Sequence, residues 1–166
     1  MLNFVYLAAF VFYPSLNMIR RFLLVDDDPD DTDLFGEALK NIDSNIEFYS
    51  GHDCNEILSQ LKGQKIKPEI IFLDINMPDM NGWDCLAALK NDQELRDIPV
   101  VMYSTSSVTL DGRKAITKGA LGFLEKPPSY EKLKEFLRKL IPASSTNLDG
   151  ELKKIAASKS HRFMAA

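Results

Sequence analysis

A single carboxylate, Asp74, lies where an apolar run meets a turn-rich stretch, in the sequence IFLDINMPDMNG of residues 71–82. Other polar side chains follow other short apolar runs in the same way. In chain order these are Asp26, Asp27 and Asp28, then Ser104, then Lys126. If the runs are parallel strands of one sheet, their carboxyl ends lie along one edge, where ligands of such sheets bind. The acids, the hydroxyl and the lysine would then share one pocket.

Carboxylates crowded in one pocket repel each other unless a cation lies among them or some are protonated. A magnesium ion meets this need, because it prefers oxygen ligands, keeps several waters and usually binds together with a phosphoryl group. Lys126 supplies a second positive charge. Two cationic centres around one carboxylate can neutralise the oxygens of a phosphoryl group in transfer, with that carboxylate as the nucleophile. These residues therefore predict phosphoryl transfer onto Asp74.

Short apolar runs alternate with stretches of helical period from residue 21 onward, which is typical of βα units around a parallel sheet. The predicted strands are residues 22–25, 46–49, 70–73, 100–103 and 121–124. The predicted helices are residues 29–42, 53–61, 83–90, 108–118 and 130–141. Helix 108–118 is the weakest, because Gly112 interrupts it and few apolar residues recur. The pattern indicates an α/β fold with a doubly wound, five-stranded parallel sheet and helices on both faces.

The composition favours one globular domain and disfavours a nucleic-acid partner. Of the 166 residues, 45% are hydrophobic, and the formal net charge is −4. Lys and Arg are scattered rather than gathered on one predicted element, so we expect no direct contact with nucleic acid. Cys54 and Cys85 have no ligand-like neighbours, and we interpret them as buried thiols of a reducing compartment. We therefore predict a cytoplasmic protein.

The predicted domain leaves a segment at each end of the chain. Residues 1–18 form an apolar extension, whose uncharged run is shorter than a membrane span and has no basic residue before it. We expect no membrane insertion and interpret this extension as an addition to a natural start at Met18. The domain itself is predicted at residues 19–141. Residues 142–166 are predicted to form a linker and a short tail that adds a turn or two of helix.

The order and spacing of these residues resemble those of response-regulator receiver domains from two-component signalling systems. The resemblance covers residues 20–141. In that family the phosphoacceptor aspartate ends the third strand and leads into a Met-Pro-x-x-x-Gly loop, which matches Asp74, Met77, Pro78 and Gly82. An acidic pair follows the first strand, a hydroxyl the fourth and a lysine the fifth. The chain is thus similar to a stand-alone receiver of the single-domain type.

The resemblance implies a role for each matching residue and the sheet order 2-1-3-4-5. The implied Mg²⁺ ligands are Asp26, Asp27, Asp74 and the backbone carbonyl of Asn76. The implied switch residues are Ser104, which turns toward the phosphoryl oxygens, and Phe123, which moves inward behind it. Lys126 matches the family's lysine beside the acceptor. Asn76 and Ser106 lie where the family varies the lifetime of the phosphoryl group.

The same resemblance implies the partners and the output. A histidine kinase or a histidine phosphotransfer protein donates the phosphoryl group. The protein acts on itself as a switch, phosphorylating and dephosphorylating its own aspartate, and is not an enzyme with an external substrate. The response alters the surface of the fourth helix, fifth strand and fifth helix, which is also a candidate homodimer interface. Pro128, where many transcription-factor receivers carry Phe, departs from that dimer-forming pattern. The downstream target is not implied.

Three other functions use parts of the same pattern. A phosphatase of the haloacid dehalogenase type also places an aspartate nucleophile beside Mg²⁺, but it needs a second aspartate where this chain has Asn76. A flavodoxin-like cofactor binder needs a phosphate-binding loop after the first strand, where this chain has three carboxylates. A receiver that binds partners without being phosphorylated stays open as an alternative, because no expected site residue is missing.

Overall fold

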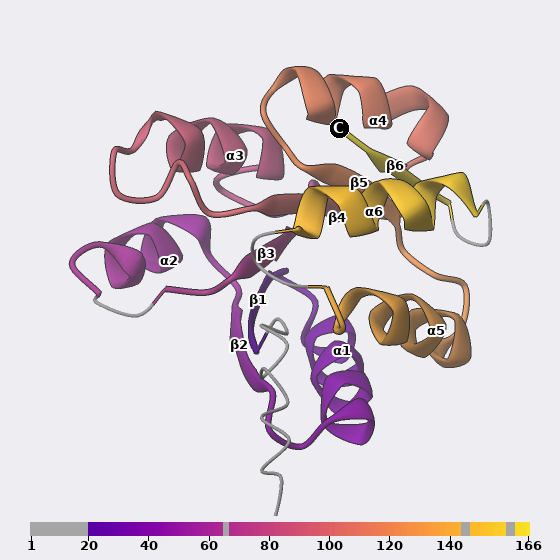
Figure 1. The fold of residues 1–166 in the computed structure, drawn as a ribbon. Coiled ribbons are helices and arrows are strands. Elements are labelled where there is room, and N and C mark those ends of the chain that lie inside the picture. The colour runs from indigo at the N-terminus through magenta and orange to yellow at the C-terminus, as the bar shows by residue number, and fades with distance from the viewer. Residues whose placement is uncertain (1–19, 65–66, 144–146, 159–161) are drawn as a thin grey trace, which may run out of the picture.

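The computed structural model describes residues 20–64, 67–143, 147–158 and 162–166. Strands and helices alternate along the chain and build one central sheet (Figure 1). The strands are β1 (Arg21–Val25), β2 (Glu47–Gly51), β3 (Ile70–Leu73), β4 (Val100–Ser104), β5 (Gly122–Glu125) and β6 (Phe163–Ala165). The helices are α1 (Pro29–Ile42), α2 (Cys54–Leu61), α3 (Gly82–Asn91), α4 (Val108–Thr117), α5 (Tyr130–Leu140) and α6 (Leu148–Ala157).

The sheet confirms the predicted arrangement of the parallel strands. Its order is β2-β1-β3-β4-β5-β6, and all pairings among β1 to β5 are parallel. The chain steps outward from β1 to β2 and then returns past β1 to β3, so the strand order reverses between β1 and β3. At this switch point Val25 is the register partner of Leu73. The residues that follow, Asp26 and Asp74, therefore leave the sheet side by side.

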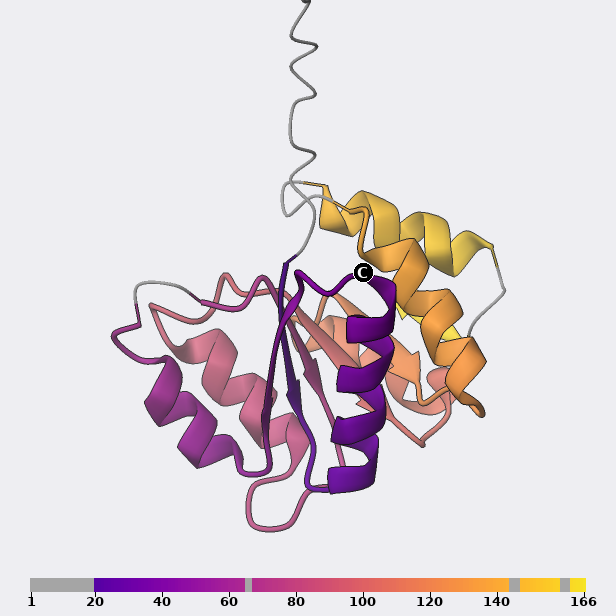
Figure 2. The same ribbon diagram turned by 90° about the horizontal axis from the view of Figure 1, so that it is seen from below.

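Helices cover both faces of the sheet, and each face has its own hydrophobic core. Alternate strand residues point to opposite faces, so Leu24 joins one core and Leu23 the other. On the first face α1, α5 and α6 pack over β1, β3 and β4, and α1 lies beside α5 (Figure 2). On the second face α2, α3 and α4 cover the same strands. This two-sided burial is why β1, β3 and β4 read as continuous apolar runs.

Local sequence sets the start of the helix that follows the first acidic cluster. The Asp28 carboxylate caps α1 by accepting a hydrogen bond from the backbone N–H of Asp30, and Pro29 occupies the first helical turn. Helix α4 is weakly packed, as predicted. Its buried residues are only Gly112 and Ala115, while Leu110 is 78% exposed. A helix held by so few apolar contacts can shift at low cost.

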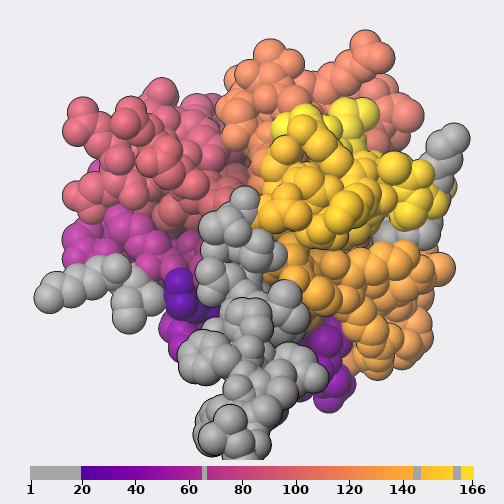
Figure 3. All heavy atoms as spheres, in the orientation of Figure 1, coloured from indigo at the N-terminus to yellow at the C-terminus, as the bar shows by residue number. Residues whose placement is uncertain are grey.

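The described part of residues 142–166 contains the predicted helix, but it packs onto the sheet as more than a linker and a short tail. Helix α6 buries Leu148, Leu152 and Ile155 in the first core, and β6 pairs antiparallel with β5 as a sixth strand. The segment fills the space between α4 and α5 (Figure 3). Its apolar side chains are few but regularly spaced, and burying them outweighs the polar character of the intervening residues. The exact limits of the domain, residues 19–141, stay a prediction.

The interpretation of the two cysteines as free thiols is wrong. Cys54 begins α2 and Cys85 lies in the first turn of α3, and their side chains form a disulfide with a Cα–Cα distance of 6.0 Å. The two helices are neighbours on the second face, which brings positions 31 residues apart into the range that a disulfide requires. A cytoplasmic location was inferred from reduced cysteines. It therefore loses that support.

The predictions for the N-terminal extension lie outside the described residues. Residues 1–18, together with the proposed start at Met18, fall in the range that the structure does not describe. Within the described ranges, no helix combines the length and the apolar character needed to cross a bilayer.

Replacing Phe163 by Ala tests whether the C-terminal strand belongs to the fold. The Phe163 ring is buried and lies 5.5 Å from the ring of Phe136, centroid to centroid. Loss of this ring should lower the free energy of unfolding by about 3 kcal/mol, as for other buried aromatic residues, measured by urea denaturation. Arg162→Ala, an exposed change on the same segment, is the control and should cost under about 1 kcal/mol. Equal stabilities would mean that β6 is not docked in solution.

Candidate functional site

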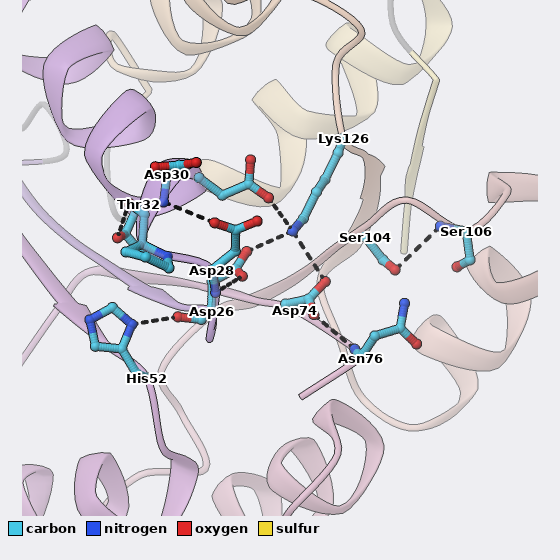
Figure 4. A network of polar contacts seen from close by, with 12 residues as sticks. Asp26, Asp28, Asp30, Thr32, His52, Asp74, Asn76, Ser104, Ser106 and Lys126 are labelled. Carbon is cyan, nitrogen blue, oxygen red and sulfur yellow. Dashed lines mark hydrogen bonds and ion pairs between the residues drawn. The ribbon is translucent and has the colours of Figure 1, made fainter. Parts of the chain in front are cut away.

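The residues that follow strands β1, β3, β4 and β5 meet in one pocket at the carboxyl edge of the sheet (Figure 4). The backbone N–H of Asp74 donates to the carbonyl of Val25, which ties the end of β3 to the end of β1. The backbone N–H of Lys126 donates to the carbonyl of Ser104, which ties the end of β5 to the end of β4. Strand pairing thus fixes the backbone of Asp74 and Lys126 at the edge of the sheet.

Three carboxylates, those of Asp26, Asp27 and Asp74, offer oxygens that all lie within 4.8 Å of one another. Asp26 and Asp74 are only 1% and 4% exposed, whereas Asp27 is exposed. Burial raises the pKa of both Asp26 and Asp74 above the ordinary carboxyl value, and the opposing effects of Lys126 and of backbone N–H groups do not cancel it. This set consists of oxygen donors alone and carries excess negative charge, which fits a hard divalent cation such as Mg²⁺.

Lys126 brings the counter-charge into the pocket from β5. Its Nζ lies 2.8 Å from Asp26 Oδ2, 2.6 Å from Asp31 Oδ2 and 3.5 Å from Asp74 Oδ1. Burial alone would lower the pKa of Lys126, but the hydrogen bonds to Asp26 and Asp31 raise it above the ordinary lysine value. The ammonium group is therefore fully charged at neutral pH. It also lies 5.4 Å from the centre of the Tyr103 ring, within the range of a cation–π contact.

The loop after β3 holds the Asp74 side chain in place. Asp74 Oδ2 accepts a hydrogen bond of 2.8 Å from the backbone N–H of Asn76. Gly82 lies against this loop so closely that a Cβ there would be 2.0 Å from the carbonyl oxygen of Asp74. Asn81 then caps α3 by accepting from the N–H groups of Trp83 and Asp84. The predicted loop motif thus works by letting the backbone pass close behind the carboxylate, and only glycine fits there.

The predicted switch residues lie on the far side of the pocket from Asp26. Ser104 is fully buried, and its Oγ accepts a hydrogen bond of 3.3 Å from the backbone N–H of Ser106. The Ser106 hydroxyl oxygen is buried and has no hydrogen-bond partner among the described residues. Phe123 is already fully buried beside Met102 and Ala115. The movement of Phe123 behind Ser104 stays a prediction, and in this structure its ring lies in the core.

Two side chains of the pocket were not singled out from the sequence. Asp31 lies in the first turn of α1 and makes the shortest contact with Lys126. His52, which follows β2, places its Nδ1 2.9 Å from the backbone carbonyl oxygen of Asp26. A signal for Asp31 existed, since it lies three residues after Asp28 at the start of a helix that begins beside the pocket. No such signal existed for His52, because its contact depends on the pairing of β1 with β2.

The family model described as "Response regulator receiver domain" matches residues 22–138. Among curated proteins, the DNA-binding dual master transcriptional regulator RpaA of Synechocystis sp. is 30% identical over 125 residues, which span 73% of this chain and 48% of that protein. This chain therefore spans about half the length of that relative.

Solved structures show the same fold. The Mn(2+)-bound form of response regulator Rcp1 is 28% identical, covers 70% of this chain and 88% of its own, and superposes with a TM-score of 0.62. The phosphorylated cyanobacterial phytochrome response regulator RcpA is 27% identical, with coverages of 72% and 89% and a TM-score of 0.60. Because the family match spans every strand of the parallel sheet and well over half of the residues, the chain belongs to the response regulator receiver domains.

Proposed function

We propose that this protein is a phosphorelay switch that accepts a phosphoryl group on Asp74 from a phosphohistidine of a histidine kinase or histidine phosphotransfer protein. The observation that carries the proposal is the placement of the Asp74 carboxylate. It is buried at the carboxyl edge of the sheet, 3.5 Å from the Lys126 ammonium and within 4.8 Å of two further carboxylates. Phosphorylation would turn Asp74 into an acyl phosphate with more negative charge. Lys126 already lies beside this position, and the neighbouring carboxylates can hold a divalent cation that supplies further positive charge.

In the proposed reaction an Asp74 carboxylate oxygen attacks the phosphorus atom, and the phosphorus–nitrogen bond to the donor imidazole breaks, leaving the electron pair on nitrogen. Receiver domains bind Mg²⁺ in such an acidic pocket, and here Asp26, Asp27, Asp74 and the Asn76 carbonyl would hold it. When bound, the ion supplies positive charge that neutralises the phosphoryl oxygens during transfer. Lys126 supplies a fixed charge on another side, and Ser104 offers a hydroxyl donor to the product. Asn76 and Ser106 flank the acceptor where water would approach.

The proposed response is a change of surface around α4, β5 and α5, the region also predicted as a homodimer interface. In this chain the outer edge of β5 is already paired with β6, where Phe123 is the register partner of Met164. Helix α4 packs against β6, and a Cβ added to Gly112 would lie 3.0 Å from the Met164 sulfur. A shift of Ser104 and of the loop before α4 would therefore reach β6 as well. We propose a protein as the downstream partner; the cytoplasmic setting stays a prediction, against which the Cys54–Cys85 disulfide weighs.

The alternative functions gain no support from the pocket. A phosphatase of the haloacid dehalogenase type needs a carboxylate two residues after the nucleophile, and the Asn76 amide cannot serve as its general acid. A flavodoxin-like phosphate site after β1 is opposed by the Asp26 and Asp27 carboxylates. A receiver that is never phosphorylated has the same residues as an active one. Only a test of phosphorylation distinguishes the two.

Asp74→Ala tests the acceptor directly. With Mg²⁺ and acetyl phosphate the wild-type protein should gain the mass of one phosphoryl group, because Asp74 is the buried carboxylate beside both proposed cations. With Mg²⁺ and beryllium fluoride its amide NMR signals near Ser104 should shift. Both responses should vanish in Asp74→Ala and in EDTA, and persist in Asp84→Ala, an exposed acid ten residues further along. A response that survives in Asp74→Ala would overturn the proposal.

Lys126→Ala tests the role of the fixed cation. The variant should fold and bind Mg²⁺, because the three carboxylates remain, but it should lose the beryllium-fluoride-induced shifts of α4 and β5, since one counter-charge for the phosphoryl oxygens is gone. Lys132→Ala removes an exposed lysine in the first turn of α5 and should behave as wild type. The readout is the NMR spectrum, with Mg²⁺ affinity as the check on the metal site. A normal response in Lys126→Ala would show that Lys126 does not transmit the signal.

Asp74→Asn tests the cost of the buried charge. The pKa of Asp74 is raised by burial, so this group favours folding below its unfolded-state pKa, and that contribution is lost as pH rises through the folded-state pKa. At neutral pH in EDTA the variant should therefore be more stable than wild type, with the gain shrinking as pH falls toward the ordinary carboxyl range. Mg²⁺ should also reduce the gain. Asp33→Asn, an exposed α1 acid, should show no such pattern in urea denaturation. A variant less stable than wild type at neutral pH would contradict the expectation.

A further inference from the structure

The shortest ion pair of the pocket involves a residue to which the proposed reaction gives no role. Asp31 Oδ2 lies 2.6 Å from the Lys126 ammonium, whereas the acceptor Asp74 Oδ1 lies 3.5 Å from it. Asp31 is also outside the group of three carboxylates whose oxygens are close enough to share a metal ion. Lys126 thus contacts both Asp26, a candidate metal ligand, and Asp31, which is not one.

The position of Asp31 is fixed by the start of α1. Asp28 caps the helix, and the Thr32 hydroxyl donates to the carbonyl of Pro29, so the first turn is rigidly placed beside the end of β1. The side chains of Asp26 and Asp31 differ in exposure, at 1% and 34%. Asp31 can therefore be solvated by water when Lys126 moves away, while Asp26 cannot. This makes Asp31 the partner that Lys126 can leave and rejoin at low cost.

Phosphorylation would replace the single negative charge of the Asp74 carboxylate by a phosphoryl group carrying roughly two, a net gain of about one negative charge beside Lys126. For its ammonium to contact the new oxygens, the contact with Asp31 must lengthen or break. A divalent cation held by Asp26, Asp27 and Asp74 would in turn compete with Lys126 for Asp26 and repel the ammonium. Asp31 would then be the carboxylate of the pocket that still holds Lys126 without touching the ion.

We propose that Asp31 is a positioning residue that holds Lys126 back from Asp74, and so lowers the affinity of the site for a phosphoryl group while supporting the binding of the divalent cation. The inference rests on the proposed function, because it concerns the same reaction. Asp31 does not touch the phosphoryl group; it acts through Lys126. Competition between Asp31 and the acceptor for one ammonium group then sets the balance between the resting and phosphorylated states.

The decisive variant is Asp31→Asn, which keeps the side-chain shape and removes the charge. With saturating Mg²⁺, its affinity for beryllium fluoride should rise about fivefold, the scale of one partly exposed ion pair. The fluorescence of Trp83, at the start of α3 beside the acceptor loop, can report the binding. Asp33→Asn is the matched control, because Asp33 lies two residues further on α1, is exposed, and has no ion pair with any described residue. Its affinity should stay within about twofold of wild type.

A double-mutant cycle on metal affinity shows whether Asp31 acts through Lys126. In the otherwise wild-type protein, Asp31→Asn should weaken Mg²⁺ binding about threefold to fivefold. The reason is that Mg²⁺ displaces the Lys126 ammonium from Asp26, and in this variant Asp31 is no longer charged to hold it. In the Lys126→Ala background the same change should cost less than about twofold, since only the long-range charge effect is left. If Asp31 had a purely structural role, Asp31→Asn would weaken the binding of both Mg²⁺ and beryllium fluoride, and the effect would be the same with and without Lys126.

The outcomes separate this inference from the proposed function. If the wild-type protein binds beryllium fluoride and Asp31→Asn behaves like Asp33→Asn or binds more weakly, the inference fails and the proposed function stands. If the wild-type protein does not bind beryllium fluoride at all, the proposed function fails, and the Mg²⁺ cycle still decides on the link between Asp31 and Lys126. Equal effects of Asp31→Asn on Mg²⁺ binding in both backgrounds would overturn that link.

Discussion

The constraint on which the structure depends is the burial of two carboxylates at the edge of a parallel sheet with one lysine between them. Asp26 and Asp74 leave neighbouring strands that are covered on both faces, so water cannot solvate them as it solvates surface acids. Lys126 offsets part of this cost from β5, two strands beyond β3. The register of the whole sheet must be correct for the charges to meet. The mutual repulsion of the carboxylates destabilises the site when no ligand is bound. Binding of a divalent cation together with a phosphoryl group would relieve this repulsion.

The same sheet links this pocket to the C-terminal segment. Strand β5 carries Lys126 at its end, Phe123 in its middle and β6 along its outer edge. Helix α4, which has few buried side chains, rests on both β5 and β6. Because α4 is weakly packed and lies close to the charged pocket, a change of charge in the pocket can shift this helix. Helix α6 and β6 therefore enlarge the surface on which the proposed switch would act.

The sequence predicted the parallel sheet and most of the site, and its failures have physical causes. Apolar runs and the polar residues after them identified Asp26, Asp74, Ser104 and Lys126, because strand ends are local features of the chain. Strand β6 is only three residues long, too short for a pattern to be recognised. The stripe of Leu148, Leu152 and Ile155 was regular, but it followed a polar stretch that reads as a linker. The pairing of Cys54 with Cys85 depends on how two helices lie side by side, which neither helix encodes alone.

The sequence by itself determined which chemical groups stand at the ends of the strands and, through the family they resemble, what chemistry these groups perform. Only the tertiary structure decided how they share their charges. That Lys126 lies closer to Asp31 than to Asp74 follows from the rotation of α1 against β5, elements 95 residues apart at this contact. Spacing along a chain fixes the order of such groups. A difference of less than an ångström between two contacts of one lysine is set by the packing of the helices and strands that carry the groups.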